Sequence, residues 1–277
     1  MFEPFIWMFK TPDFKRNYIK LVICSIILLL ISTVCILWLH NTITVFNNKT
    51  IFSVYAYSIL LLILKILPFI LLLGYFWELT SNIIDRDFDV NAGSIFNGKI
   101  QTINKFTFPN WDPFKFVWRG FASIVATSIM AIPWTVLLTM YITGNIAQNY
   151  TPASFMANID TIYKPIVLLA LIYTFLLPGL FWNYASKNSV FSALNIHKAV
   201  YIAGNYTFRY LINSFLFIAI CCLFWDISII FINPNLIFNP QISFSYIIVQ
   251  ILLIIKNAFL IHIQAYLLGT ITPPSEG

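Results

Sequence analysis

Charged residues are scarce in this chain. Only 9% of its 277 residues are Asp, Glu, Lys or Arg, whereas a soluble domain has about 25%. Hydrophobic residues make up 60%, whereas a soluble domain has about 45–50%. A soluble fold of this length could not cover so much apolar surface. The composition therefore excludes an ordinary soluble enzyme and predicts one integral membrane domain over residues 1–277, with the lipid bilayer as its surroundings.

Cysteine is also rare, and the motifs of common catalytic sites are missing. The four cysteines show no CxxC spacing and have no neighbouring histidine, which argues against zinc or redox chemistry and predicts free, buried thiols. There is no phosphate-binding glycine loop, no GxSxG and no HExxH. We therefore expect no cofactor. The net charge of +6 fits basic membrane loops, so nucleic acid is not expected as a partner.

Six apolar stretches are long enough to cross a bilayer, for which a helix needs about 20 residues. Aromatic residues flank most of their ends, as expected at the membrane interface. The fold expected is an all-α bundle of six membrane helices. Their predicted bounds are Leu21–Leu39, Phe52–Phe76, Trp118–Tyr141, Tyr163–Tyr184, Leu211–Ile232 and Ile242–Leu268.

The lysines and arginines fall mostly on one side of these six spans. The opposite side carries only Lys49 and Lys164, and Lys65 and Lys256 lie within spans. Since basic loops stay in the cytoplasm, the pattern predicts a plasma-membrane protein with both termini inside. The residues on the predicted cytoplasmic side are Lys10, Lys15, Arg16, Lys20, Arg86, Lys99, Lys105, Lys115, Arg119, Lys187, Lys198 and Arg209.

Two spans end alike. The second contains Gly74-Tyr75-Phe76-Trp77 and the fourth contains Gly179-Leu180-Phe181-Trp182. Basic and aromatic clusters precede the spans that follow each of them. This similarity suggests three helical hairpins in one orientation, a parallel repeat. The alternative is that Gly and aromatic residues are common wherever a helix leaves a membrane.

Three motifs follow one another in the first half of the chain. They are the stretch Phe9–Leu21 with its Pro, Asp, aromatic and Lys residues, then Leu67-Pro68 with Gly74-Tyr75, then Pro109-Asn110-Trp111-Asp112 with Arg119-Gly120. Together they resemble a prokaryotic membrane family called domain of unknown function 4013. The second half is similar to that family only in hydropathy and in the Ala-Ser…Tyr character of its fourth loop. The resemblance implies a bacterial or archaeal cell-membrane protein, and it supplies no functional residues.

An acidic cluster follows the second span. Asp85, Asp87 and Asp89 resemble the first aspartate motif of UbiA-type prenyltransferases, whose carboxylates hold Mg²⁺ against a prenyl diphosphate. Mg²⁺ binding by a few carboxylates and phosphate oxygens would suit the cluster. However, the second aspartate motif of that family has no counterpart, because residues 184–210 contain no Asp or Glu. The alternative, a solvated juxtamembrane loop, is therefore favoured.

Three ionisable residues lie at membrane depth. Lys65 and Lys256 fall near the middle of their spans, and Asp226 lies in the fifth. A lone charge at that depth costs at least about 2.5–3.5 kcal/mol, so these residues should face inward and pair. Such pairs either fix the register of the helices or form part of a solute or proton path.

The sixth span carries a polar stripe. Gln250, Asn257 and Gln264 are spaced by seven residues and therefore lie on one helix face, which we expect to point inward. His262 lies on another face and is expected to be packed or interfacial. The third span has a ridge of small residues, at four-residue steps, that would allow close helix packing.

The sequence as a whole favours a non-enzymatic membrane protein, an assembly, scaffold or regulatory subunit with other membrane subunits as partners. A small permease that uses Lys65, Asp226 and Lys256 is the first alternative. A degenerate Mg²⁺-dependent prenyl-lipid enzyme that uses Asp85, Asp87 and Asp89 is the second.

Overall fold

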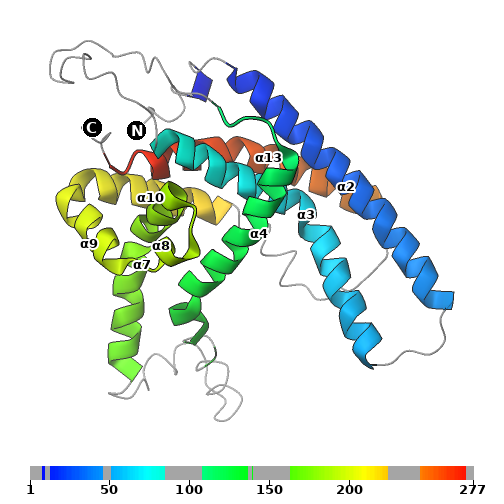
Figure 1. Cartoon of the computed structure of the whole chain (residues 1–277), viewed down its shortest axis with the longest axis horizontal. Coiled ribbons are helices and arrows are strands. Elements are labelled where there is room, and N and C mark those ends of the chain that lie inside the picture. Colours follow the sequence, from blue (N-terminus) through cyan, green and yellow to red (C-terminus); the bar gives the residue numbers. More distant parts are fainter. Residues whose placement is uncertain are drawn as a thin grey trace.

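The structure, a computed structural model, describes residues 8–9, 13–45, 51–84, 108–136, 139, 163–223 and 244–272. This part of the chain contains helices and no strand (Figure 1), as the sequence predicted. The helices are α2 (Phe14–Val45), α3 (Ile51–Ile84), α4 (Pro113–Met130), α7 (Tyr163–Lys187), α8 (Val190–Ala193), α9 (Ile196–Asn205), α10 (Thr207–Leu223) and α13 (Phe244–Gly269).

Three of the described helices are long and apolar enough to cross a membrane. They are Phe14–Leu39 of α2, Ala56–Ile84 of α3 and Tyr246–Gly269 of α13. The prediction of a membrane protein is confirmed at this level. Helices α4, α7 and α10 overlap the other three predicted spans, and within α10 the stretch Thr207–Cys221 forms a shorter apolar helix.

Several helices extend beyond their predicted bounds. Helix α2 begins at Phe14, ahead of the predicted start at Leu21, and α3 continues past Phe76 to Ile84. The predictions followed the apolar runs, whereas a helix continues through polar residues when one face stays packed. The segment between the fourth and fifth predicted spans also differs, because it forms α8 and α9.

Helix α3 lies at the centre of the described fold, where it packs against α2, α4, α7 and α13. Figure 1 shows that α3 changes direction along its length. Pro68 lies inside the helix, where it removes a backbone donor and its ring clashes with the preceding turn. A bent α3 can follow α2 over its first half and α4 and α13 over its second.

The crossing of α3 and α4 depends on two glycines. A Cβ at Gly74 would overlap the carbonyl of Phe116, and a Cβ at Gly120 would overlap the carbonyl of Ile70. The two backbones are therefore in direct contact, as small residues allow in membrane proteins. Helix α4 starts just before this crossing, where the side chain of Asp112 accepts a hydrogen bond from the amide of Lys115 at 3.1 Å.

Helices α7 and α9 make a second close contact. A Cβ at Gly179 would lie 3.0 Å from the Cβ of Ala199. Asn188, with a φ of 49°, ends α7 in the left-handed conformation typical of a helix C-terminus, and the chain then turns into α8. The glycine of each Gly-x-Phe-Trp ending thus contacts a later helix, α4 in one case and α9 in the other.

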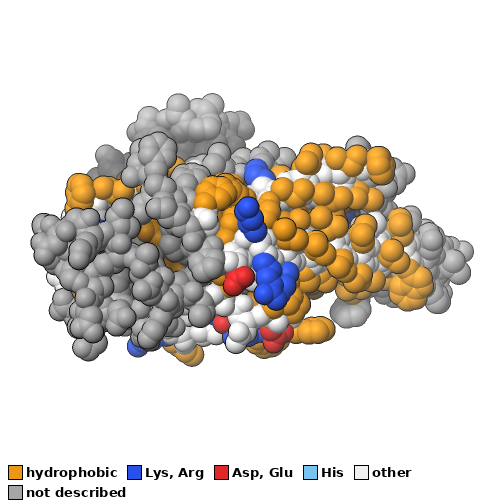
Figure 2. Space-filling model, turned by 90° about the horizontal axis from the view of Figure 1, so that it is seen from above, with side chains coloured by type: hydrophobic (Ala, Val, Ile, Leu, Met, Phe, Trp, Pro, Cys, Tyr) orange, Lys and Arg blue, Asp and Glu red, His pale blue; other side chains and the backbone are white. Residues whose placement is uncertain are grey.

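The outer surface is largely apolar. Figure 2 shows hydrophobic side chains spread over the long outer helices, with Lys, Arg, Asp and Glu side chains gathered in a band beside them. Large side chains such as Val34, Trp38 and Phe215 are more than half exposed. This much exposed apolar surface is compatible with contact to lipid. The cysteines were expected to be buried, but Cys24 and Cys35 are only half-buried and Cys221 is exposed, all as free thiols.

Candidate functional site

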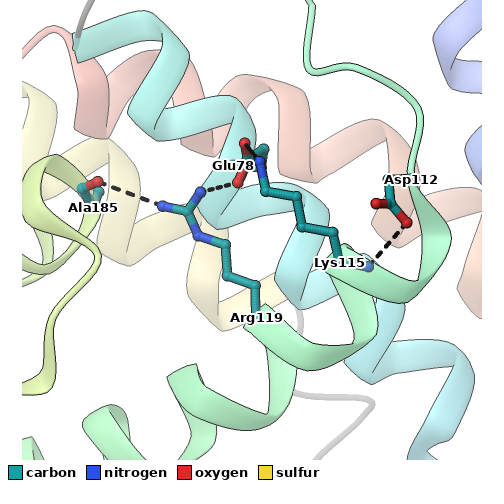
Figure 3. Close-up of polar contacts among 5 residues, drawn as sticks. All are labelled: Glu78, Asp112, Lys115, Arg119 and Ala185. Atoms are coloured by element: carbon teal, nitrogen blue, oxygen red, sulfur yellow. Dashed lines mark hydrogen bonds and ion pairs between the residues drawn. The ribbon is translucent and has the colours of Figure 1, made fainter.

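A cluster of three charged side chains joins α3 and α4. The carboxylate of Glu78 accepts a hydrogen bond from Nζ of Lys115 at 2.6 Å through Oε1, and Oε2 pairs with Nη1 of Arg119 (Figure 3). The side chain of Arg119 is 5% exposed and that of Lys115 is 55% exposed. One buried and one accessible cation therefore neutralise the same carboxylate.

The cluster also reaches α7. Nη2 of Arg119 donates to the backbone carbonyl of Ala185 at 3.5 Å. Figure 3 shows the guanidinium between Glu78 and Ala185. Arg119 thus links three helices close to the Gly74–Gly120 crossing. Its planar donor set suits such bridging better than the single ammonium of a lysine.

His262 of α13 is fully buried among aromatic rings. Its ring centroid lies 5.0 Å from that of Phe14 and 5.5 Å from that of Tyr75. Nδ1 lies 2.7 Å from the carbonyl oxygen of Ala258, so this nitrogen carries the proton and donates. Nε2 is then the acceptor, 3.4 Å from the hydroxyl of Tyr75. Of the two expected alternatives, packed or interfacial, the structure places His262 in the packed core.

A cavity of about 400 Å³ lies between α3, α4, α7, α10 and α13. Phe69, Phe76 and Trp77 of α3 form much of its wall, and Ile124 and Phe217 contribute from α4 and α10. Asn257 and Gln264, two members of the predicted polar stripe, line the cavity from α13. The remaining wall is almost entirely apolar.

The polar residues predicted inside the spans do not all lie at the cavity. Lys65, Gln250 and Asn257 are buried, whereas Lys256 is half-buried. Only Asn257 of these four lines the cavity. Asp226 lies outside the described residues. Its predicted pairing with Lys65 or Lys256 therefore stays a prediction.

The acidic cluster Asp85, Asp87 and Asp89 also lies outside the described residues. Within the described ranges, no group of three or more His, Cys, Asp and Glu side chains is placed to hold a metal ion.

The charged cluster at Glu78 was not predicted. The second span was predicted to end at Phe76, and Lys115 and Arg119 were predicted only to lie on the cytoplasmic side of the membrane. One signal was available: Lys115 and Arg119 are four residues apart, so on a helix they present two cations on one face. Glu78 is the first carboxylate after the apolar run of the second predicted span.

Comparison with known proteins gives no match for this chain among family models, curated proteins or solved structures.

Proposed function

We propose that this chain is a multi-pass plasma-membrane protein with six spans, both termini in the cytoplasm and no catalytic activity of its own. Its role is that of an assembly, scaffold or regulatory subunit that works with other membrane proteins. The parallel arrangement of three hairpins and the resemblance to domain of unknown function 4013 are part of the same proposal.

The observation that carries this proposal is that buried charged side chains pair with one another. Glu78 is neutralised by two cations of α4, and Arg119 continues to a backbone carbonyl of α7. Buried charges that are paired in this way hold helices in one arrangement, and Glu78 and Arg119 are engaged with each other. The described cavity is lined by no Lys, Arg, His, Asp or Glu, which is compatible with a non-enzymatic role.

Purification in a mild detergent tests the subunit role. We expect a second membrane protein to co-purify in fixed stoichiometry, and its amount in the membrane to fall when this chain is absent. A clean, monodisperse monomer whose loss leaves the composition of the membrane unchanged would contradict the proposal.

The permease alternative is supported by one observation, the burial of Lys65 inside α3. A permease needs water at Lys65 or Lys256, although neither residue lines the described cavity. Single cysteines at these two positions, in a background without native cysteines, would be labelled by a membrane-impermeant maleimide only if water reaches them. Lys187→Cys, which is exposed, serves as the reactive control and Ala258→Cys, which is fully buried, as the unreactive one.

Labelling of Lys65→Cys or Lys256→Cys at the rate of Lys187→Cys would favour a permease. Labelling at the rate of Ala258→Cys would remove that alternative. The prenyl-lipid enzyme predicts instead that Mg²⁺ with a prenyl diphosphate raises the Tm, and that Asp85→Ala with Asp89→Ala abolishes the rise.

A further inference from the structure

The cavity between the five helices has the size and lining of a site for an apolar ligand. Its volume of about 400 Å³ falls within the range of about 300–1,000 Å³ that is typical of ligand pockets. Most pockets of this kind have apolar walls and a small number of polar groups that orient the ligand. Here the polar groups are contributed mainly by α13.

Asn257 is the exceptional residue in this lining. Its side chain is fully buried, and neither Nδ2 nor Oδ1 has a hydrogen-bond partner among the described residues. Two other polar side chains of the wall are engaged: Gln264 donates to Sγ of Cys221 at 3.2 Å and Thr127 donates to the carbonyl of Ser123 at 2.8 Å. A buried amide without partners is costly, so an unengaged one in a cavity wall points to a ligand that supplies both a donor and an acceptor.

A second unengaged donor lies on the same wall. Nε1 of Trp77 is buried and also has no partner among the described residues. Water could pair with these polar atoms, but it would leave the rest of the wall, which is nearly all apolar, without favourable contacts. An apolar molecule with one polar head suits the lining better.

The polar head should carry no charge. None of the residues that line the cavity is Lys, Arg, His, Asp or Glu. A carboxylate, phosphate or ammonium group would therefore lose its hydration without gaining a counterion, which is strongly unfavourable. A hydroxyl group both donates and accepts, and needs no counterion.

We propose that the cavity binds a single-chain, uncharged lipid whose hydroxyl head hydrogen-bonds to the amide of Asn257, with the apolar chain along the wall formed by α3 and α10. The ligand enters from the surrounding bilayer, where such molecules dissolve. This inference does not depend on the subunit role, because a scaffold, a permease or an enzyme could each hold a lipid at this place.

Photo-labelling in lipid nanodiscs tests the proposal, with a diazirine derivative of hexadecan-1-ol as the probe. We expect saturable labelling of about one probe per chain, on peptides of α3 and α13 that line the cavity. Unlabelled hexadecan-1-ol should compete at a mole fraction about tenfold lower than hexadecane does, which is the value of two neutral hydrogen bonds. Hexadecyl phosphate should compete more weakly than hexadecan-1-ol.

Three variants make the test specific. Asn257→Leu keeps the size of the side chain and removes both polar atoms, so it should weaken competition by hexadecan-1-ol about tenfold. The same variant should raise the Tm of the lipid-free protein, because it removes two unsatisfied groups. Ile124→Trp should fill the cavity and abolish saturable labelling. Ser25→Ala is the matched control, since Ser25 is fully buried, its Oγ has no partner among the described residues, and it lies outside the cavity. The labelling of this variant should equal that of the unmodified chain.

Several results would overturn the proposal. Equal competition by hexadecane and hexadecan-1-ol would show that no polar head is recognised. Unchanged competition in Asn257→Leu, or saturable labelling that survives in Ile124→Trp, would place the lipid elsewhere. A lower Tm of lipid-free Asn257→Leu together with lost labelling would make Asn257 a structural residue only.

Discussion

Glu78 and Arg119 lie on different helices, yet they form the buried half of an ion-pair cluster whose other half, Lys115, is accessible. The relation is asymmetric, because the guanidinium of Arg119 also contacts the carbonyl of Ala185. Loss of Arg119 would leave a carboxylate that is nearly buried with only one exposed cation as its partner. Loss of Lys115 would leave the buried pair intact.

This asymmetry predicts that removal of the two cations lowers the free energy of unfolding by different amounts. Arg119→Ala should destabilise the protein by about 3–5 kcal/mol, the usual cost of removing one partner of a buried pair. Lys115→Ala should cost no more than about 1 kcal/mol, as for exposed pairs. Reversible unfolding in mixed micelles measures both, and Arg119→Lys should recover only part of the loss, since an ammonium cannot bridge to α7. Equal costs for Arg119→Ala and Lys115→Ala would contradict the arrangement.

The contact between Gly74 and α4 predicts a second difference. Gly74→Ala should destabilise the protein by about 1–3 kcal/mol, because the added methyl group meets the backbone of Phe116 and the helices must separate. Gly204→Ala in α9 is the matched control, since nothing lies within 4 Å of a Cβ there. It should be neutral or stabilising by up to about 1 kcal/mol, the helix propensity of Ala over Gly.

The same unfolding assay compares the two glycine variants. Both substitutions add one methyl group to a helix and therefore change helix propensity alike. The difference between their free energies of unfolding thus reports the packing at Gly74. If both variants gained stability, α3 and α4 would not be in backbone contact at Gly74.

The hydroxyl group of Tyr210 bridges two backbone groups of α7. The hydroxyl oxygen accepts from the amide of Gly179 at 3.3 Å, and the hydroxyl donates to the carbonyl of Phe175 at 2.6 Å. These two backbone groups, four residues apart, would pair directly in a regular helix. Pro178, beside Gly179, lies in the same turn, where a helix is prone to bend.

Removal of this hydroxyl should therefore be costly. Tyr210→Phe leaves a buried donor and acceptor in α7 without their bridge, for which we expect a loss of about 1–3 kcal/mol. Tyr201→Phe on α9, whose side chain is 59% exposed, should change the stability by less than about 0.5 kcal/mol. Differential scanning fluorimetry of the two variants side by side tests the bridge, and equal Tm values for both would exclude it.

The apolar content of the chain predicted its helical, membrane-type fold, because the bilayer leaves few alternatives to helices. The polar stripe of α13 was also visible, since a seven-residue spacing of Gln250, Asn257 and Gln264 can be read directly. What sequence reasoning could not supply was the partner of each polar group. Hydropathy ended α3 at Phe76 and so missed Glu78, whose burial depends on cations more than 35 residues away in the chain.

The cavity could not be predicted for a related reason. Its wall combines residues of five helices, and no single segment of the sequence indicates that a cavity forms between them. The two Gly-x-Phe-Trp endings were recognised as similar, but their meaning depends on which helix each glycine meets: α4 for Gly74 and α9 for Gly179. Contacts of this type follow from how helices cross, which short sequence patterns do not specify.

The distribution of Lys and Arg makes a prediction about topology. With native cysteines replaced, single cysteines at Thr11 and Ser275 should react with an impermeant maleimide only in inside-out membrane vesicles, because basic segments remain in the cytoplasm. Cysteines at Asn48 and Asn149 should react only in right-side-out vesicles. Six spans require this alternation, since an odd number would place Thr11 and Ser275 on opposite sides. Reaction of Thr11→Cys and Ser275→Cys from opposite faces would therefore contradict six spans while leaving α2, α3 and α13 as membrane helices.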